Sequence, residues 1–280
     1  METEPPLHLP PGQRVLVFDS GIGGITILSA LRAQAPGLNV GYAADTGFFP
    51  YGDKSDTALE ARVPTVAAAL VKAARPDLFV IACNTASTLA LDAVRARLDI
   101  PVVGTVPAIK PAVAASETGT IGLLATPGTL RRAYTARLLS EFARDVHVVS
   151  YGSVELVRLA ERLVAGDKVS AGEVEAAQAP LFDQAGAHQI DTVVLACTHF
   201  PLLRDLLEQT SPQPVRYIDS GEAIARQTLR ILSALDAQDD TLGPVGAWVT
   251  SDTASEPLLP AALQRYGFET LSEVTVPAAS

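Results

Sequence analysis

The amino-acid sequence predicts an α/β protein of two similar domains, each a mostly parallel sheet covered by helices, with the functional site between them. Three observations lead to this prediction. Short runs of β-branched and apolar residues alternate with helical stretches rich in Ala and Leu, the pattern of parallel strands joined by crossover helices. The chain has 280 residues, which is long for one core and sufficient for two. Finally, some segments of the chain resemble each other.

Eight short runs are predicted to be strands. Some are apolar at every position, as in strands that are buried on both faces of a sheet. The predicted strands span residues 15–18, 39–43, 78–82, 101–103, 120–125, 146–150, 192–196 and 216–218. Helical patterns lie between them, up to about residue 34 and at 57–74, 130–143, 154–165, 171–185 and 223–235.

Two pairs of segments suggest an internal repeat. Residues 78–86, Leu-Phe-Val-Ile-Ala-Cys-Asn-Thr-Ala, resemble residues 192–200, Thr-Val-Val-Leu-Ala-Cys-Thr-His-Phe. Residues 17–21, Val-Phe-Asp-Ser-Gly, resemble residues 217–221, Tyr-Ile-Asp-Ser-Gly. In both pairs a polar residue follows an apolar strand, so we expect two similar halves that face each other.

Proline-containing segments mark the predicted crossings between the halves, at residues 106–111 and 210–214. The sequence therefore predicts a discontinuous first domain of residues 13–106 and 214–276, and a second domain of residues 107–213. The ends, before about residue 13 and after about residue 276, are expected to be loose.

Composition excludes several classes of protein. The formal net charge of −10 argues against a nucleic-acid partner, and it means that an anionic substrate must be held by local donors. The sequence shows neither a signal peptide nor a run of about 18 apolar residues. We therefore expect a cytoplasmic protein without a membrane partner. Thiols stay reduced in that compartment, so the two cysteines are expected to be free.

Cys83 lies where a predicted apolar strand meets a predicted helix. Ligands bind at the carboxyl ends of the strands in open α/β sheets. The free N–H groups at the start of the helix are expected to lower the pKa of the thiol and to hold a carboxylate. A lone cysteine is as often a small buried hydrophobe.

Cys197 occupies the same kind of junction, and this repetition favours a chemical role for both thiols. His199 lies two residues further on, where an imidazole could assist proton transfer near neutral pH. A zinc site is disfavoured because structural sites need four closely spaced Cys or His ligands. A Cys–His hydrolase stays possible, but it would leave one cysteine unexplained.

Asp19 follows the predicted strand 15–18 and precedes a turn that contains Gly21, Gly23 and Gly24. The glycines allow the backbone to approach a ligand closely, but their spacing does not match the dinucleotide fingerprint. The carboxylate could orient a thiol or accept the ammonium of a substrate. An N-cap role for Asp19 or Ser20 is equally compatible with the sequence.

Six short motifs, taken in order, resemble the glutamate racemase family, within the broader aspartate/glutamate racemase group. Each motif is modest alone, and together they extend from about residue 15 to residue 225. They are Val17–Gly24; Ala44-Asp-Thr with Pro50-Tyr-Gly; Ile81–Ser87; the segment from Val103-Gly to Pro107-Ala; Leu195–Leu203; and Ile218–Gly221.

The resemblance implies a cofactor-independent and metal-free interconversion of L- and D-glutamate, which supplies D-glutamate for peptidoglycan synthesis, in a cytoplasmic homodimer. It implies that Cys83 and Cys197 act on opposite faces of the α-carbon, with Asp19 supporting Cys83 and His199 supporting Cys197. The substrate-binding residues that it implies are Asp19, Ser20, Pro50, Tyr51, Gly52, Asn84, Thr85, Thr198 and His199.

One segment departs from the family pattern. The family usually has a Cys-Pro-containing stretch leading into Val-Glu, whose glutamate assists the second cysteine, whereas this chain has Gly-Ser-Val-Glu at residues 152–155. Alignment favours Glu161 for this role, with Glu155 as the alternative. Pyridoxal phosphate chemistry needs a Schiff-base lysine, and no lysine has a suitable setting.

Two other functions remain open. The chain could act on another small acid, as aspartate racemase or maleate isomerase does, although the motifs favour glutamate. It could also be a two-domain protein that closes on an amino acid without chemistry. The matched cysteines argue against the second alternative, because binding alone requires no thiol.

Overall fold

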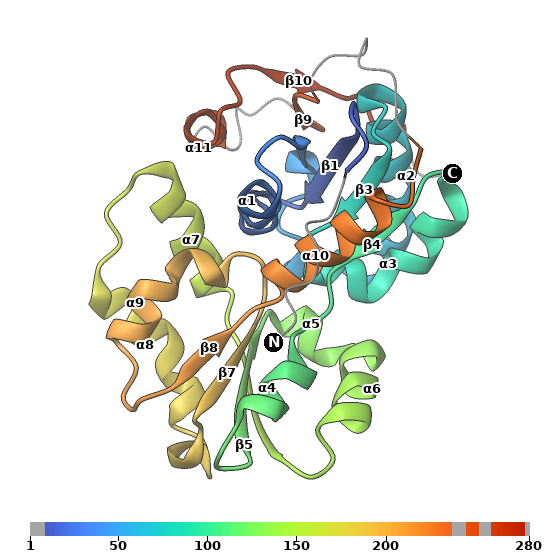
Figure 1. Ribbon diagram of the computed structural model, residues 1–280. Coiled ribbons are helices and arrows are strands. Elements are labelled where there is room, and N and C mark those ends of the chain that lie inside the picture. Colours follow the sequence, from blue (N-terminus) through green and yellow to red (C-terminus); the bar gives the residue numbers. More distant parts are fainter. Residues whose placement is uncertain (1–8, 237–244, 252–258, 278–280) are drawn as a thin grey trace.

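The computed structural model describes residues 9–236, 245–251 and 259–277. Two parallel sheets form two lobes that meet along one edge (Figure 1). The first lobe has the strand order β10-β9-β2-β1-β3-β4, and the second lobe has the order β6-β5-β7-β8. All paired strands are parallel. This confirms the predicted fold class of two helix-covered, parallel sheets.

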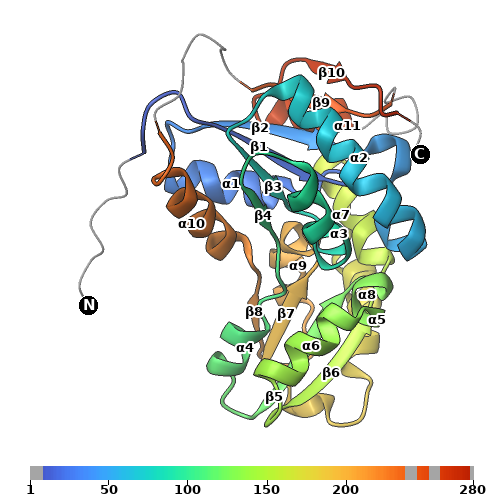
Figure 2. The same cartoon turned by 90° about the vertical axis from the view of Figure 1, so that its right-hand side faces the viewer.

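The first lobe places helices on both faces of its sheet (Figure 2). Its strands are β1 (Arg14–Asp19), β2 (Asn39–Ala44), β3 (Leu78–Ile81), β4 (Val102–Gly104), β9 (Ala247–Val249) and β10 (Leu271–Glu273). One face packs against α1 (Ile25–Gln34), α10 (Gly221–Leu232) and α11 (Leu259–Arg265). The other packs against α2 (Asp56–Ala74) and α3 (Asn84–Arg97). Two 3-10 turns, η1 (Thr46–Phe48) and η2 (Tyr51–Asp53), precede α2.

The second lobe repeats this layering around four strands. They are β5 (Thr120–Ala125), β6 (His147–Gly152), β7 (Thr192–Ala196) and β8 (Arg216–Ile218). One face packs against α7 (Glu155–Ala165), α8 (Ala171–Phe182) and α9 (Arg204–Gln209). The other packs against α4 (Ile109–Ala115), α5 (Pro127–Arg131) and α6 (Ala133–Phe142). The 3-10 turns η3 (Ala187–Gln189) and η4 (Phe200–Leu203) flank β7.

The strand order bears out one of the two sequence similarities and overturns the other. Within each lobe the first four strands of the chain lie in the order second, first, third, fourth. Strands β3 and β7 are therefore equivalent, as the two cysteine segments predict. The similarity of residues 17–21 to residues 217–221 does not mark equivalent positions, because β1 corresponds to β5 and β8 corresponds to β4. That similarity is local.

The chain crosses to the second lobe between the end of β4 and the start of α4, and it returns after β8. Strand β8 pairs with β7, so residues 216–218 belong to the second sheet. A boundary at residue 214 would have placed them in the first domain. Backbone hydrogen bonding to β7 decides this membership, which a proline-rich segment cannot reveal. The division into domains otherwise stays a prediction.

Two further differences concern short elements. Strands β9 and β10 have three residues each, too few for a recognisable apolar run. The helix predicted at 130–143 is divided into α5 and α6 at Arg132, which has an extended backbone (φ −80°, ψ 141°). Among the described residues, no helix has the length and apolar character needed to cross a membrane.

Candidate active site

Cys83 lies at the junction between β3 and α3, in the N-cap position of the helix. Strand β3 is buried along its whole length, which fixes the position of its carboxyl end. The Cys83 thiol is 3.9 Å from the hydroxyl oxygen of Ser20, which follows β1, the neighbouring strand. Adjacent parallel strands thus bring Ser20 and Cys83 to the same edge of the sheet.

Cys197 takes the equivalent place after β7 in the second lobe. Its Sγ lies 3.8 Å from Nδ1 of His199, and η4 begins at the next residue, Phe200. Both cysteines are free, and each is 6% exposed. The equivalence of β3 and β7 therefore gives each lobe one thiol at a matching strand end.

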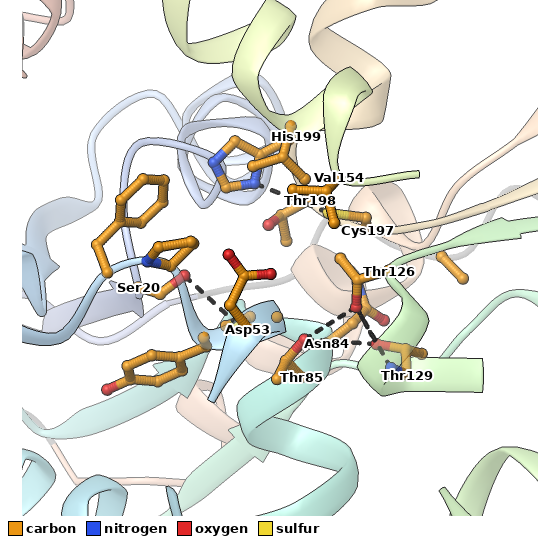
Figure 3. A pocket seen from close by; sticks show the side chains of 17 residues that line it. Ser20, Asp53, Asn84, Thr85, Thr126, Thr129, Val154, Cys197, Thr198 and His199 are labelled. Atoms are coloured by element: carbon orange, nitrogen blue, oxygen red, sulfur yellow. Dashed lines mark hydrogen bonds between the residues drawn. The ribbon is translucent and has the colours of Figure 1, made fainter. Parts of the chain in front are cut away.

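The two cysteines line the same cavity between the lobes. Figure 3 shows that side chains from both lobes point into it. Every predicted substrate-binding residue except Asp19 lines the cavity. The lining residues are Ser20, Phe49, Pro50, Tyr51, Gly52, Asp53, Cys83, Asn84, Thr85, Thr126, Thr129, Val154, Val157, Ala196, Cys197, Thr198 and His199.

Asp19 lies behind the lining and connects the two lobes. Its carboxylate accepts hydrogen bonds from the Gly21 backbone N–H (3.1 Å) and from the Thr198 hydroxyl (2.9 Å). The Ser20 hydroxyl is 3.4 Å from Asp19 Oδ1 and lies between this carboxylate and the Cys83 thiol. Burial raises the pKa of Asp19, against the opposing effect of nearby His199. Asp19 therefore reaches Cys83 through Ser20.

The pKa of Cys83 corrects one expectation. The helix N-terminus was predicted to lower it, but burial and the neighbouring Asp19 carboxylate raise it to about 12. The Ala86 backbone N–H does lower the pKa, as a helix N-terminus should, but it is outweighed. Removing a thiolate from water disfavours the charged form more strongly than one N–H donor favours it. Cys83 is accordingly a protonated thiol near neutral pH.

Glu161 contacts His199, the residue beside the second cysteine. Its Oε1 is 2.6 Å from His199 Nε2 and also accepts the Ile22 backbone N–H of the first lobe at 3.2 Å. Burial tends to lower the pKa of His199, but its hydrogen bonds to Cys197 and Glu161 hold that pKa well above the usual value. An imidazolium therefore lies between the Cys197 sulfur and the Glu161 carboxylate.

The competing residue, Glu155, has a different setting. It is an exposed residue at the start of α7, where it pairs with Arg158 at 3.4 Å. Six residues further along α7, Glu161 faces the site instead. The structure thus places Glu161, and not Glu155, against the Cys197–His199 pair.

The glycine turn after β1 packs directly against the second lobe. A β-carbon on Gly23 would lie 2.5 Å from both His199 Nδ1 and Thr198 Oγ1. One on Gly21 would lie 2.7 Å from Glu161 Oε1 and from the Phe49 ring. The missing side chains, rather than an unusual backbone angle, allow the lobes to approach this closely.

Several predicted substrate-binding residues present polar groups to the cavity. Asn84 is buried, and its Oδ1 has no hydrogen-bond partner. Thr85 lies within 3.4 Å of two hydroxyls from the second lobe, Thr126 and Thr129; we call these three residues the hydroxyl cluster. Tyr51 lines the cavity, but its hydroxyl donates to Asp45 at 2.6 Å. Its phenol group is thus already engaged.

The sequence analysis did not identify Thr126 and Thr129, nor Phe49, Asp53, Val154 and Val157, as site residues. The signal for the two threonines was available in principle. Strand β5 is the counterpart of β1. Thr126 directly follows β5, as Ser20 directly follows β1. The similarity of residues 17–21 to residues 217–221 instead suggests the end of β8 as the counterpart of the end of β1. Asp219 there pairs with Arg204 and accepts the Gly221 N–H at 2.7 Å, a structural role.

Within the described residues, no group of three or more His, Cys, Asp or Glu side chains is arranged to hold a metal ion. The polar groups that line the cavity are thiols, hydroxyls, an amide, an imidazole and the Asp53 carboxylate. These groups can transfer protons and form hydrogen bonds with a small polar molecule.

Fold and site together define a class of protein, a two-lobed α/β protein with one thiol from each lobe at a shared cavity. The chain belongs to the Asp/Glu/hydantoin racemase family, whose model matches residues 26–228. It is 46% identical over 268 residues to a glutamate racemase of Salmonella gallinarum, covering 95% of this chain and 93% of that protein.

Solved structures agree with this assignment. Escherichia coli glutamate racemase, in a complex with L-glutamate and the activator UDP-MurNAc-Ala, superposes with a TM-score of 0.88 at 42% identity, covering 96% of this chain and 100% of that one. A glutamate racemase isoform from Bacillus anthracis gives a TM-score of 0.77 at 28% identity, covering 95% and 98%. The similarity thus extends over both lobes.

Replacement of Gly23 by alanine tests the contact between the glycine turn and the second lobe. The added methyl group would collide with His199 and Thr198, so we expect a loss of about 1–3 kcal/mol in the free energy of unfolding and a large loss of turnover. Urea denaturation and a racemisation assay measure the two effects. Gly37→Ala is the matched control, because nothing lies within 4 Å of its added β-carbon. Equal behaviour of the two variants would contradict the contact.

Glu161→Gln tests the cause of the raised His199 pKa. The amide keeps the size of the side chain but removes its negative charge, so the pKa of His199 should fall. The imidazolium would then lose its proton at a lower pH than in the unaltered protein. NMR titration of the His199 ring measures this change directly. Glu155→Gln should leave the titration as it is, and an unshifted His199 in Glu161→Gln would rule out this assignment.

Proposed function

We propose that this protein is a glutamate racemase that uses Cys83 and Cys197 as two opposed acid–base groups, without a cofactor. The observation that carries the proposal is the placement of the two thiols at equivalent strand ends of two lobes, on one shared cavity. Inversion at an α-carbon requires proton removal on one face and proton delivery on the other. Two groups from opposite lobes suit that requirement.

The surroundings of the two thiols differ. Cys83 holds its proton, because its pKa is about 12. The His199 imidazolium, 3.8 Å from Cys197 Sγ, stabilises negative charge on that sulfur. We therefore infer that Cys197 is the base and Cys83 the acid for the enantiomer that presents its α-proton to Cys197. The roles reverse for the other enantiomer.

The remaining groups suit a small amino acid with two carboxylates. Free N–H groups at the start of α3 can hold the α-carboxylate and stabilise the charge that develops as the α-proton leaves. The unpartnered Asn84 Oδ1 is available to accept a hydrogen bond from the substrate ammonium. The hydroxyl cluster supplies donors for a side-chain carboxylate. Glutamate is also the substrate named for the Salmonella and E. coli relatives.

The physiological setting follows from the substrate. D-Glutamate produced in the cytoplasm would supply peptidoglycan synthesis and so support cell-wall biogenesis and cell shape. We also propose that the protein acts as a homodimer. Size-exclusion chromatography with light scattering would test the last point.

The first experiment uses the purified, reduced protein in D₂O with D-glutamate and no added cofactor. We expect optical rotation and the α-proton NMR signal to disappear together, because each inversion delivers a deuteron from a thiol that has exchanged with the solvent. Exchange of the α-proton of aspartate but not of glutamate would support the two-thiol mechanism and identify aspartate as the substrate. If folded protein changes neither the optical rotation nor the α-proton signal of either amino acid, the proposal is contradicted.

Single replacements of the two cysteines test their separate roles. Cys83→Ala and Cys197→Ala should each lower the racemisation rate by about a thousandfold or more, since general acid–base groups typically contribute about 10²–10⁴-fold. Each variant keeps one base, so any residual α-proton exchange in D₂O should be confined to one enantiomer, and to opposite enantiomers in the two variants. Circular dichroism checks that both variants fold. Full racemisation by either variant would refute the two-thiol mechanism.

A further inference from the structure

Arg132 interrupts a segment that local preferences would make one continuous helix. Helix α5 ends at Arg131 and α6 begins at Ala133, and Arg132 between them has an extended backbone. Arginine and alanine are good helix formers, and Pro127 lies at the start of α5 rather than at the break. The cause of the break must therefore be tertiary.

The side chain of Arg132 crosses from the second lobe to the first. It is only 4% exposed, and it donates from Nη1 to the Thr85 carbonyl at 3.2 Å and from Nη2 to Asp56 Oδ1 at 3.0 Å. Thr85 lies in the first turn of α3, and Asp56 is the first residue of α2. One guanidinium group thus joins the α5–α6 break to the starts of two helices in the other lobe.

These contacts lie directly behind the cavity wall. The hydroxyl of Thr85 belongs to the hydroxyl cluster, and its carbonyl is the group that Arg132 holds. Arg132 also lies beside the η2 turn, since a β-carbon on Gly128 would be 3.3 Å from the Gly52 carbonyl oxygen and 3.6 Å from both terminal nitrogens of Arg132. Displacement of this side chain would therefore disturb the cavity wall on both sides of the hydroxyl cluster.

The charge of Arg132 is significant because of what the cavity lacks. The described residues that line it include neither lysine nor arginine, and the whole chain has a formal net charge of −10. The His199 imidazolium lies between Cys197 and Glu161, so a second carboxylate on the substrate would meet only hydroxyl groups at the hydroxyl cluster. In addition, the buried Nε of Arg132 has no hydrogen-bond partner, which costs stability. Stability alone therefore does not explain an arginine at this position.

We propose that Arg132 is a positioning residue that sets recognition of the substrate's side-chain carboxylate. It holds Thr85 against Thr126 and Thr129, and it places a positive charge behind these hydroxyls without touching the reacting atoms. This inference rests on the proposed glutamate racemase activity. It predicts an effect on substrate affinity rather than on the proton-transfer steps, because both cysteines lie outside the contacts of Arg132.

The test compares Arg132→Gln with Arg131→Gln, a replacement of the exposed neighbouring arginine. Initial rates of racemisation are measured by circular dichroism over a range of D-glutamate concentrations. For Arg132→Gln we expect the KM to rise about tenfold or more, as for loss of a charge-assisted hydrogen bond, while kcat stays within about threefold of its original value. Arg131→Gln should change neither constant.

Arg132→Lys provides a second variant that keeps the charge. A single ammonium group cannot reproduce the two-pronged guanidinium geometry, so its KM should fall between those of the unaltered protein and Arg132→Gln. If Arg132→Gln does not fold, the lysine variant decides the question, and an unchanged KM would overturn the proposal. So would a fall in kcat at unchanged KM in either variant. Failure of the unaltered protein to racemise glutamate would instead remove the proposed function, and this inference with it.

Discussion

The hydrogen bond from the Thr198 hydroxyl to the Asp19 carboxylate, 2.9 Å long, joins the two lobes at the point where both strand ends reach the cavity. Asp19 follows β1 in one lobe and Thr198 lies beside Cys197 in the other. A second hydrogen bond, from the Ile22 backbone N–H to Glu161, also joins the two lobes. Neither can form unless the glycine turn approaches the second lobe closely, which Gly21 and Gly23 allow. The relative position of the two thiols thus depends on this contact.

The two carboxylates at this contact, Asp19 and Glu161, have different effects near the two thiols. Asp19 adds negative charge near Cys83 and raises its pKa, whereas Glu161 holds a protonated His199 beside Cys197. An internal repeat would by itself give two similar thiols. The two carboxylates differ in what they contact. Asp19 reaches Cys83 through Ser20, whereas Glu161 reaches Cys197 through His199. The two thiols therefore lie in different electrostatic environments, which suits the acid–base roles proposed for them.

Sequence patterns predicted much of this arrangement because the determining information was local. Apolar runs predicted β3 and β7, and each cysteine directly follows its strand, so a shared location required only the rule that ligands bind at the carboxyl ends of parallel strands. Thr126 and Thr129 escaped prediction because their place depends on the equivalence of β5 with β1, which only strand order reveals. Strand β8 was assigned to the wrong sheet for a similar reason. Its sequence specifies a strand but does not specify a neighbour.

The sequence by itself determined the two-sheet α/β class, the two cysteine junctions and the glycines after β1, because periodicity and residue type act over a few neighbouring positions. The tertiary structure decided everything that depends on contacts between residues far apart in the chain. It selected Glu161 over Glu155, broke the helix at Arg132, and raised the pKa of Cys83 where a helix N-terminus alone would lower it. Burial and charge at a site are sums over residues far apart in the chain. They are therefore fixed only when the two lobes pack together.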